Sequence, residues 1–134
     1  MKIYIIIAFS LLIFSCKSNQ QLSPKNSLIS ISKNPCLKNC EVSDLHFYSD
    51  GTFIYNGVLN THLNGNYKGK ISLKELSEIK NTLNELSKDI PLIKGRDIPS
   101  ITIKYESANK TYHANHKELK NLKLITEKIV SSIK

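Results

Sequence analysis

Residues 45–55, LHFYSDGTFIY, are the stretch that decides the fold, because two apolar and aromatic runs flank Asp50-Gly51. Asp-Gly favours a tight turn, since glycine adopts positive φ angles at little cost and aspartate tolerates them. The pattern predicts one strand from Val42 to Ser49 and an antiparallel partner from Thr52 to Tyr55. The domain is therefore expected to contain an antiparallel sheet.

Further strand signals lie on both sides of this hairpin. Apolar alternation from Ile29 predicts a first strand over residues 28–32, which Asn34-Pro35 ends. Asn56-Gly57 predicts a second turn after the hairpin. Asn64-Gly65 predicts another turn, followed by a short strand.

Two more strands are expected in the second half of the chain. Ser100 to Glu106 has alternating apolar residues, with Ile101, Ile103 and Tyr105 on one face. Asn109-Lys110 is expected to turn the chain into a last strand from Thr111 to Ala114.

Two amphipathic helices complete the pattern. Ser72 and Glu75 have the spacing of a capping box, which predicts a helix of about sixteen residues beginning there. A second helix is expected to begin near Asn115 or His116. The apolar residues that recur at helical spacing are Leu73, Leu76, Ile79, Leu83 and Leu86 in the first helix, and Leu119, Leu122, Ile125, Ile129 and Ile133 in the second.

The predicted order is β-β-β-β-α-β-β-α, which places the chain in the α+β class. About six strands would form an antiparallel β-meander sheet, and both helices would pack on one face of it because each must bury an apolar stripe. A chain of this length supports one domain with a single modest core.

The first sixteen residues, MKIYIIIAFSLLIFSC, indicate export. Lys2 precedes an apolar run that is too short to span a bilayer and is typical of a signal peptide. Ile13, Ser15 and Cys16 resemble the lipobox of bacterial lipoproteins, in which the cysteine is lipidated. A plain membrane anchor or an ordinary signal peptide, with no role for Cys16, stays open.

The chain is accordingly divided into three parts. Residues 1–15 are expected to be a lipoprotein signal peptide, and residues 16–27 the lipidated cysteine and a flexible polar tether. Residues 28–134 are expected to form the single α+β domain. No acidic cluster follows Cys16, which favours an outer-membrane anchor with the domain facing the periplasm.

The charge of the chain does not indicate a nucleic-acid partner. The formal net charge is +8, but Arg96 is the single arginine among 19 basic residues. The planar guanidinium is the group that recognises phosphates and base edges with paired hydrogen bonds, so a balance made of lysine is a poor signature for nucleic acid. The lysines are expected to form a solvated surface.

Cys36 and Cys40, in NPCLKNCEV (residues 34–42), are the chemically distinctive pair. Past the inner membrane such a pair normally oxidises, which favours a structural disulfide between two strands. A reactive thiol-disulfide pair is a second interpretation, although C-x-x-x-C in a strand-to-strand loop lacks the helix N-terminus that lowers a thiol pKa.

A metal site is the third interpretation of the cysteines. Cys36 and Cys40 would act with His113 and His116, whose H-x-x-H spacing can chelate on a helix. These histidines fall instead at a predicted strand-to-helix junction, so no metal and no cofactor is predicted. The chain has no G-x-S-x-G, no H-E-x-x-H and no glycine-rich phosphate loop, so no enzyme is predicted either.

The cysteine pair, the Asp50-Gly51 turn and the loop Asp97-Ile98-Pro99-Ser100 together resemble an uncharacterised family of bacterial lipoproteins. That family opens with C-x-G-x-C-P-x-Y, and the resemblance covers about residues 28–133. The chain departs from the motif at three positions, which are Lys38, Glu41 and Ser43. The resemblance implies an envelope lipoprotein with an α+β fold and supplies no activity.

The sequence thus predicts a membrane-anchored envelope lipoprotein whose domain is a non-enzymatic binding or interaction module. Its expected partners are the membrane, through Cys16, and another envelope protein or a small molecule of unknown identity. The alternative is a thiol-disulfide or metal-handling envelope protein that uses Cys36 and Cys40. A hydrolase or inhibitor with an unrecognised site is a third possibility.

Overall fold

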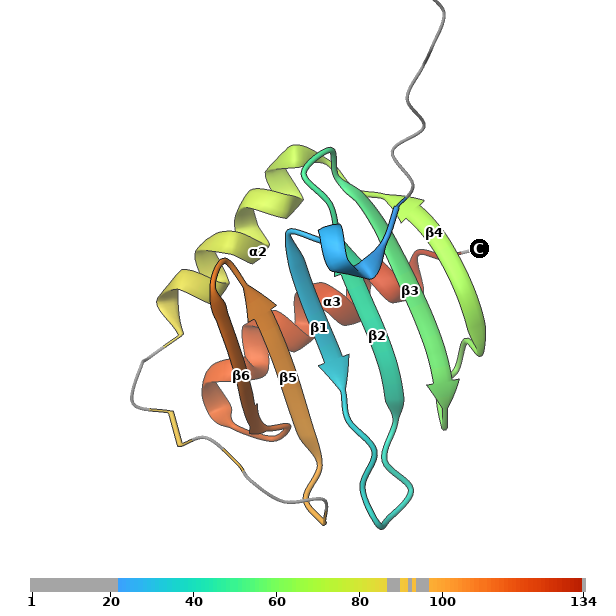
Figure 1. The fold of residues 1–134 in the computed structure, drawn as a ribbon, viewed down its shortest axis with the longest axis vertical. Coiled ribbons are helices and arrows are strands. Elements are labelled where there is room, and N and C mark those ends of the chain that lie inside the picture. Colours follow the sequence, from blue (N-terminus) through green and yellow to red (C-terminus); the bar gives the residue numbers. More distant parts are fainter. Residues whose placement is uncertain (1–21, 87–89, 92, 94–96, 134) are drawn as a thin grey trace, which may run out of the picture.

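The computed structural model describes residues 22–86, 90–91, 93 and 97–133, so the predicted signal peptide and Cys16 lie outside the described residues. The domain consists of a six-stranded sheet with helices on one face (Figure 1). The elements are η2 (Pro24–Asn26), β1 (Ile29–Lys33), β2 (Val42–Phe47), β3 (Thr52–Leu59), β4 (Gly65–Lys70), α2 (Leu73–Glu85), β5 (Ser100–Tyr105), β6 (Ala108–His113), η3 (Lys117–Leu119) and α3 (Lys120–Ser131). The α+β class and the element order predicted from the sequence are confirmed.

The strands lie in the order β4-β3-β2-β1-β5-β6, and every neighbouring pair is antiparallel. The first four strands form the predicted meander. The chain then passes through α2 to the other side of β1, where β5 and β6 form a second hairpin. β1 is therefore an inner strand. It pairs with β2 from the first half of the chain on one side and with β5 from the second half on the other.

The Asp-Gly turn between β2 and β3 forms as predicted. Gly51 has a φ of 81°, and its N–H donates to the carbonyl oxygen of Tyr48. Asp50 accepts hydrogen bonds from the backbone N–H and the hydroxyl of Thr52, which fixes the start of β3. A Cβ at Gly51 would overlap the carbonyl oxygen of Ile71, so glycine is required by both its conformation and its surroundings.

Two predicted turns are wrong. Asn56-Gly57 continues β3, because Gly57 pairs with Gly65 and leaves room for the carbonyl oxygen of Leu63 to pack against its backbone. Asn109-Lys110 lies inside β6, and the turn before it contains Glu106, which adopts a φ of 54°. The turn between β5 and β6 was not predicted, because a non-glycine residue with positive φ gives a weak signal in the sequence.

The two helices begin where the sequence indicates. Ser72 caps α2, and the side chain of Glu75 accepts from the backbone N–H of Ser72 in a complete capping box. The helix is shorter than expected and Leu73 is 65% exposed, so the apolar stripe begins one turn later. His116 caps the short η3, and α3 follows directly.

The core lies between the sheet and the two helices. Both helices lie behind the sheet in Figure 1, where they cover the face that carries the inward apolar residues of each strand. The most completely buried large side chains are Phe47, Ile29, Ile79, Leu119 and Leu122. None of the helices in the described part of the chain is long and apolar enough to cross a bilayer.

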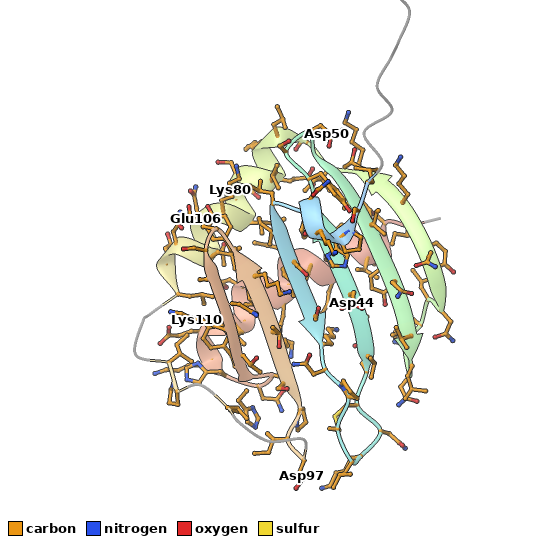
Figure 2. All side chains as sticks on the ribbon, in the orientation of Figure 1. Asp44, Asp50, Lys80, Asp97, Glu106 and Lys110 are labelled. Carbon is orange, nitrogen blue, oxygen red and sulfur yellow. A yellow bond between two sulfur atoms is a disulfide. The ribbon has the colours of Figure 1, made fainter. Side chains whose placement is uncertain are left out.

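The opposite face of the sheet, which we call the open face, carries polar side chains. Alternation puts Ser30 and Ser32 of β1 and Asp44 and His46 of β2 on this face. Figure 2 labels Asp44 among the side chains of the sheet. Small polar side chains leave this surface available for hydrogen bonding while the other face holds the core. At the outer edge of β6, the N–H of Ile93 donates to the carbonyl oxygen of Thr111.

Two leucines of α2 allow the burial pattern to be tested. Leu76 is 3% exposed and Leu73 is 65% exposed. Leu76→Ala is expected to lower the free energy of unfolding by about 2–5 kcal/mol, because it leaves a cavity in the core. Leu73→Ala, the matched control, is expected to change it by less than about 0.5 kcal/mol. Urea unfolding measures both, and equal losses would contradict the helix orientation described here.

Candidate functional site

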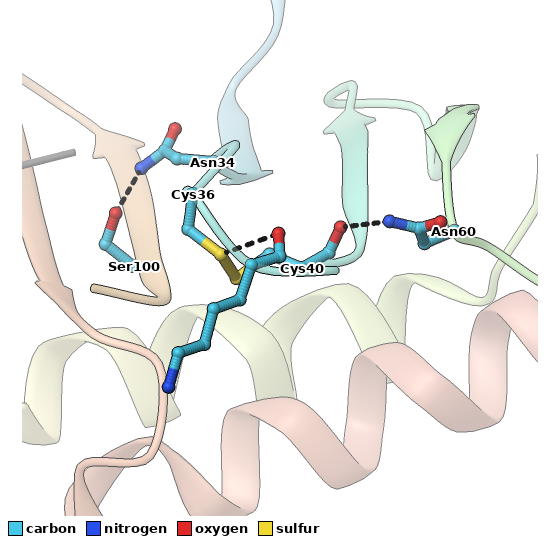
Figure 3. The surroundings of a disulfide bond; sticks show 6 residues. Asn34, Cys36, Cys40, Asn60 and Ser100 are labelled. Carbon is cyan, nitrogen blue, oxygen red and sulfur yellow. Dashed lines mark hydrogen bonds between the residues drawn. A yellow bond between two sulfur atoms is a disulfide. The ribbon is translucent and has the colours of Figure 1, made fainter. Parts of the chain in front are cut away.

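The loop between β1 and β2 (residues 34–41) holds the cysteine pair. Cys36 and Cys40 form a disulfide, and their Cα atoms are 5.7 Å apart, in the usual range for this bond (Figure 3). The N–H of Cys40 donates to the carbonyl oxygen of Lys38, so the disulfide closes one compact turn. The two cysteines are therefore oxidised and lie in a strand-to-strand loop, as the first of the three interpretations, a structural disulfide, expects.

Two asparagines fix this loop to the strands on either side. The side-chain N–H groups of Asn34 donate to the hydroxyls of Ser100 and Thr102 on β5, at 3.0 and 2.9 Å. The side chain of Asn60, from the β3–β4 connection, donates to the carbonyl oxygen of Cys40 at 3.0 Å. The loop is thus held at both ends over the end of the sheet (Figure 3).

An ion pair joins the two strands at the base of the loop. Lys33 Nζ lies 2.7 Å from Glu41 Oε2, and the two side chains are 25% and 40% exposed. A pair this accessible contributes only about 0–1 kcal/mol to stability. Its effect is to place one positive and one negative charge at a fixed position beside the core.

A cavity of about 550 Å³ opens next to this ion pair, on the helix side of the sheet. The side chains that line it come from β1, β2, the β3–β4 connection and the end of α3. Its aliphatic lining consists of Ile31, Leu45, Leu63, Val130 and Ile133. Its polar lining includes Lys33, Glu41, Ser43, His62 and Glu127. A cavity of this size with apolar walls and a few polar groups is typical of a small-molecule site.

A β-bulge lies beside this cavity, at the lining residue Ser43. The register between β2 and β3 shifts between Val42 and Ser43, so that Val42 pairs with Leu59 while Ser43 pairs with Gly57. Bulges bend a strand locally and often lie beside functional sites. The cavity was not predicted from the sequence, and Gly57, which pairs with Ser43 next to the bulge, is the residue that could have indicated it.

The proposed metal ligands do not converge in the described part of the chain. A second hollow, of about 310 Å³, is lined by Cys40 and by Asn115 of the β6–η3 junction, but by neither His113 nor His116. His113 Nδ1 accepts from the N–H of Asn115, and His116 Nδ1 accepts from the N–H of Glu118. Among the described residues, no group of three histidine, cysteine or acidic side chains is placed to hold a metal ion.

The carboxylates of Asp44, Asp50 and Asp97 could in principle serve as catalytic acids or bases, but they are not grouped into one site. The hydroxyl and the N–H of Thr52 hold the pKa of Asp50 below its usual range, as expected for a turn residue. Asp44 accepts a hydrogen bond from the hydroxyl of Ser32 on the open face. Asp97 is exposed in the loop before β5. These residues lie on different elements and do not form an acid–base pair.

Comparison with known protein families gave one result. Residues 27–132 match the family described as "Domain of unknown function (DUF6438)". The match covers nearly all of the described residues, including the disulfide loop, the sheet and both helices. No curated protein and no solved structure gave a significant match.

The disulfide gives a quantitative prediction. The bond joins residues four positions apart, so it restricts the unfolded chain only a little, and the chain-entropy model gives about 2 kcal/mol. The double variant Cys36→Ser, Cys40→Ser should lose about this much free energy of unfolding in urea and should keep its fold. A pair that serves redox chemistry would instead be reduced readily by glutathione in the folded protein, which a thiol-labelling assay would detect.

Proposed function

The chain belongs to the DUF6438 family, a family of unknown function, and from this premise we propose that it is a membrane-anchored envelope lipoprotein whose domain binds a small amphiphile. The single observation that carries the binding function is the cavity beside the disulfide loop. The anchoring rests on the N-terminal sequence and its resemblance to a lipobox.

The chemistry of the cavity supports an amphiphile with an aliphatic chain. Residues from the strands and from α3 give a continuous aliphatic wall, which favours burial of hydrocarbon by about 25 cal/mol for each Å² removed from water. The charged residues of the lining are of both signs, since Lys33 is paired with Glu41 and Glu127 adds a further carboxylate. This balance favours an uncharged or zwitterionic head group over an anionic one.

The departures from the lipoprotein motif are consistent with a ligand cavity in this chain. Two of the three positions that differ from C-x-G-x-C-P-x-Y, Glu41 and Ser43, line the cavity. Ser43 is buried on the helix face of β2. A tyrosine at this position, as in the motif that the segment resembles, would project into the cavity and fill part of it.

The alternative is a thiol-disulfide or metal-handling protein. The C-x-x-x-C loop between two strands gives neither thiol the helix N-terminus that activates redox cysteines, and the disulfide loop is fixed by hydrogen bonds to β5 and to Asn60. These contacts favour a fixed structural element beside the cavity.

Binding is tested with the full chain in phosphatidylcholine nanodiscs and dodecylphosphocholine, a zwitterionic amphiphile, below its micelle-forming concentration. Methyl NMR shifts are expected at Ile31, Leu45 and Val130, and not at Ile79 in the helix-covered core. Dodecanoate, with the same chain length and an anionic head, should bind more weakly. Ser43→Tyr should abolish the shifts, whereas Val58→Tyr, an exposed position on β3, should keep them. Uniform shifts, or none, would reject the cavity as the site.

Anchoring is tested separately in a bacterial host. The full chain should incorporate labelled palmitate and fractionate with the outer membrane, because acylation of the cysteine supplies more than one acyl chain for stable attachment. Cys16→Ala should lose the label and leave the membrane fraction, while the cysteines of the disulfide loop can be replaced without effect on labelling. Label retained in Cys16→Ala would contradict lipidation at this residue.

A further inference from the structure

We propose that the open face carries a second binding site, for an anion that also bears hydroxyl groups, such as a sugar acid or a sugar phosphate. The site lies on the side of the sheet opposite the amphiphile cavity, centred on His46 and Tyr48. It is independent of the proposed function, because no residue is shared between the two.

The strand register aligns the charged residues of this site. His46 pairs with Ile54, which pairs with Lys68 on β4. On its other side His46 pairs with Ser30, which pairs with Lys104 on β5. Adjacent strands are about 4.8 Å apart, so each lysine begins about 10 Å from His46 in one row across the sheet. Two lysines therefore flank His46 in this row, and their positive charges attract an anion.

Two buried polar atoms in this region have no hydrogen-bond partner among the described residues. They are Nδ1 of His46 and the hydroxyl oxygen of Tyr48. Tyr48 is only 6% exposed, although its own N–H donates to the carbonyl oxygen of Thr52. Buried polar groups in folded proteins are nearly always paired, and leaving one unpaired is unfavourable. Both atoms belong to open-face residues of one short stretch of chain, which points to a ligand that completes their bonding.

The surface is hollowed at the same place. One hollow, of about 540 Å³, is lined by Tyr48, Lys68 and Asn26, and another, of about 390 Å³, by His46, Lys104 and Pro24. η2 contributes a residue to each hollow and lies in front of the sheet over the ends of β1 and β2 (Figure 1). His46 and Tyr48, which carry the unpaired atoms, and the two lysines thus line recesses and do not lie on a flat surface.

The lining of the hollows favours an anion that also carries hydroxyl groups. Burial lowers the pKa of His46, against an opposing effect of Asp44, and Lys104 lowers it further. The ring is therefore neutral near pH 7 and offers one donor and one acceptor nitrogen. Asn56 and Thr102 lie in the same hollow and supply hydrogen-bonding groups for hydroxyls. Asp50 and Asp44 each line one of the two hollows as well, and their carboxylates already accept hydrogen bonds from Thr52 and Ser32.

Calorimetry on the full chain in phosphatidylcholine nanodiscs tests the proposal with three probes, glucuronate, glucose 6-phosphate and glucose. Binding of glucuronate alone identifies a carboxylate site, and binding of glucose 6-phosphate alone a phosphate site. Either result, with glucose at least about tenfold weaker, supports the proposal, because the two lysines should contribute a charge-assisted interaction. Equal binding of glucose, or no binding of either anion at millimolar concentration, would overturn it.

Variants separate the site from a purely structural role. Tyr48→Phe removes the unpaired hydroxyl, so it should weaken the binding of the anion about tenfold. The midpoint of urea unfolding should stay unchanged or rise, because the variant no longer buries an unpaired hydroxyl. Tyr55→Phe, on the helix face of β3, should leave anion affinity unchanged. The double variant Lys68→Gln, Lys104→Gln should also weaken the binding of the anion. Lys80→Gln on α2, the control, should leave the affinity unchanged. Unchanged affinity in Tyr48→Phe and in the lysine double variant would reject this location.

Discussion

The register of β1 between β2 and β5 is the constraint on which the rest of the structure depends. It places Ile29 and Ile31 against the helices and Ser30 and Ser32 on the open face, and both neighbouring strands follow the same alternation. A slip of one residue would exchange the two sets and expose the core side chains. The cavity proposed to bind an amphiphile is lined by Ile31 and Lys33 of the inward row of β1, and the hollow proposed to bind an anion is lined by Ser30 of the outward row. One pairing pattern therefore positions both candidate sites.

Much of this fold could be predicted from local sequence. Asp50-Gly51 and the capping box of Ser72 and Glu75 each specify a conformation within a few residues, and both form as predicted. The predictions are wrong where tertiary contacts, and not the local sequence, determine the conformation. Gly57 is needed because the carbonyl of Leu63 packs against it, and not because the chain turns there. Leu73 fits the helical period, but it is the first residue of α2 and its side chain stays 65% exposed.

The candidate sites were less predictable than the fold, for a physical reason. The cysteine pair is close in sequence, so its pairing could be proposed from spacing and compartment. The cavity instead combines Ile31, Leu63 and Val130, which lie far apart in the chain and meet only after the sheet and α3 have packed. The same holds for Lys68 and Lys104, which the strand order brings into one row. His46 carries no motif, and it is marked only by its buried Nδ1, which has no hydrogen-bond partner among the described residues.

The two outer strands also determine how the domain behaves beside copies of itself. β4 contains Gly65 and Gly69 together with Lys68 and Lys70, and the outer edge of β6 is partly occupied by the backbone at Ile93. Lysines on an exposed edge, and a backbone N–H that already pairs with the other edge, both hinder the addition of a further strand. Proteins crowded on a surface encounter their neighbours far more often than proteins in dilute solution. A sheet with these edges is suited to such crowding, because the lysines of β4 and the backbone at Ile93 beside β6 hinder a neighbouring molecule from adding a strand.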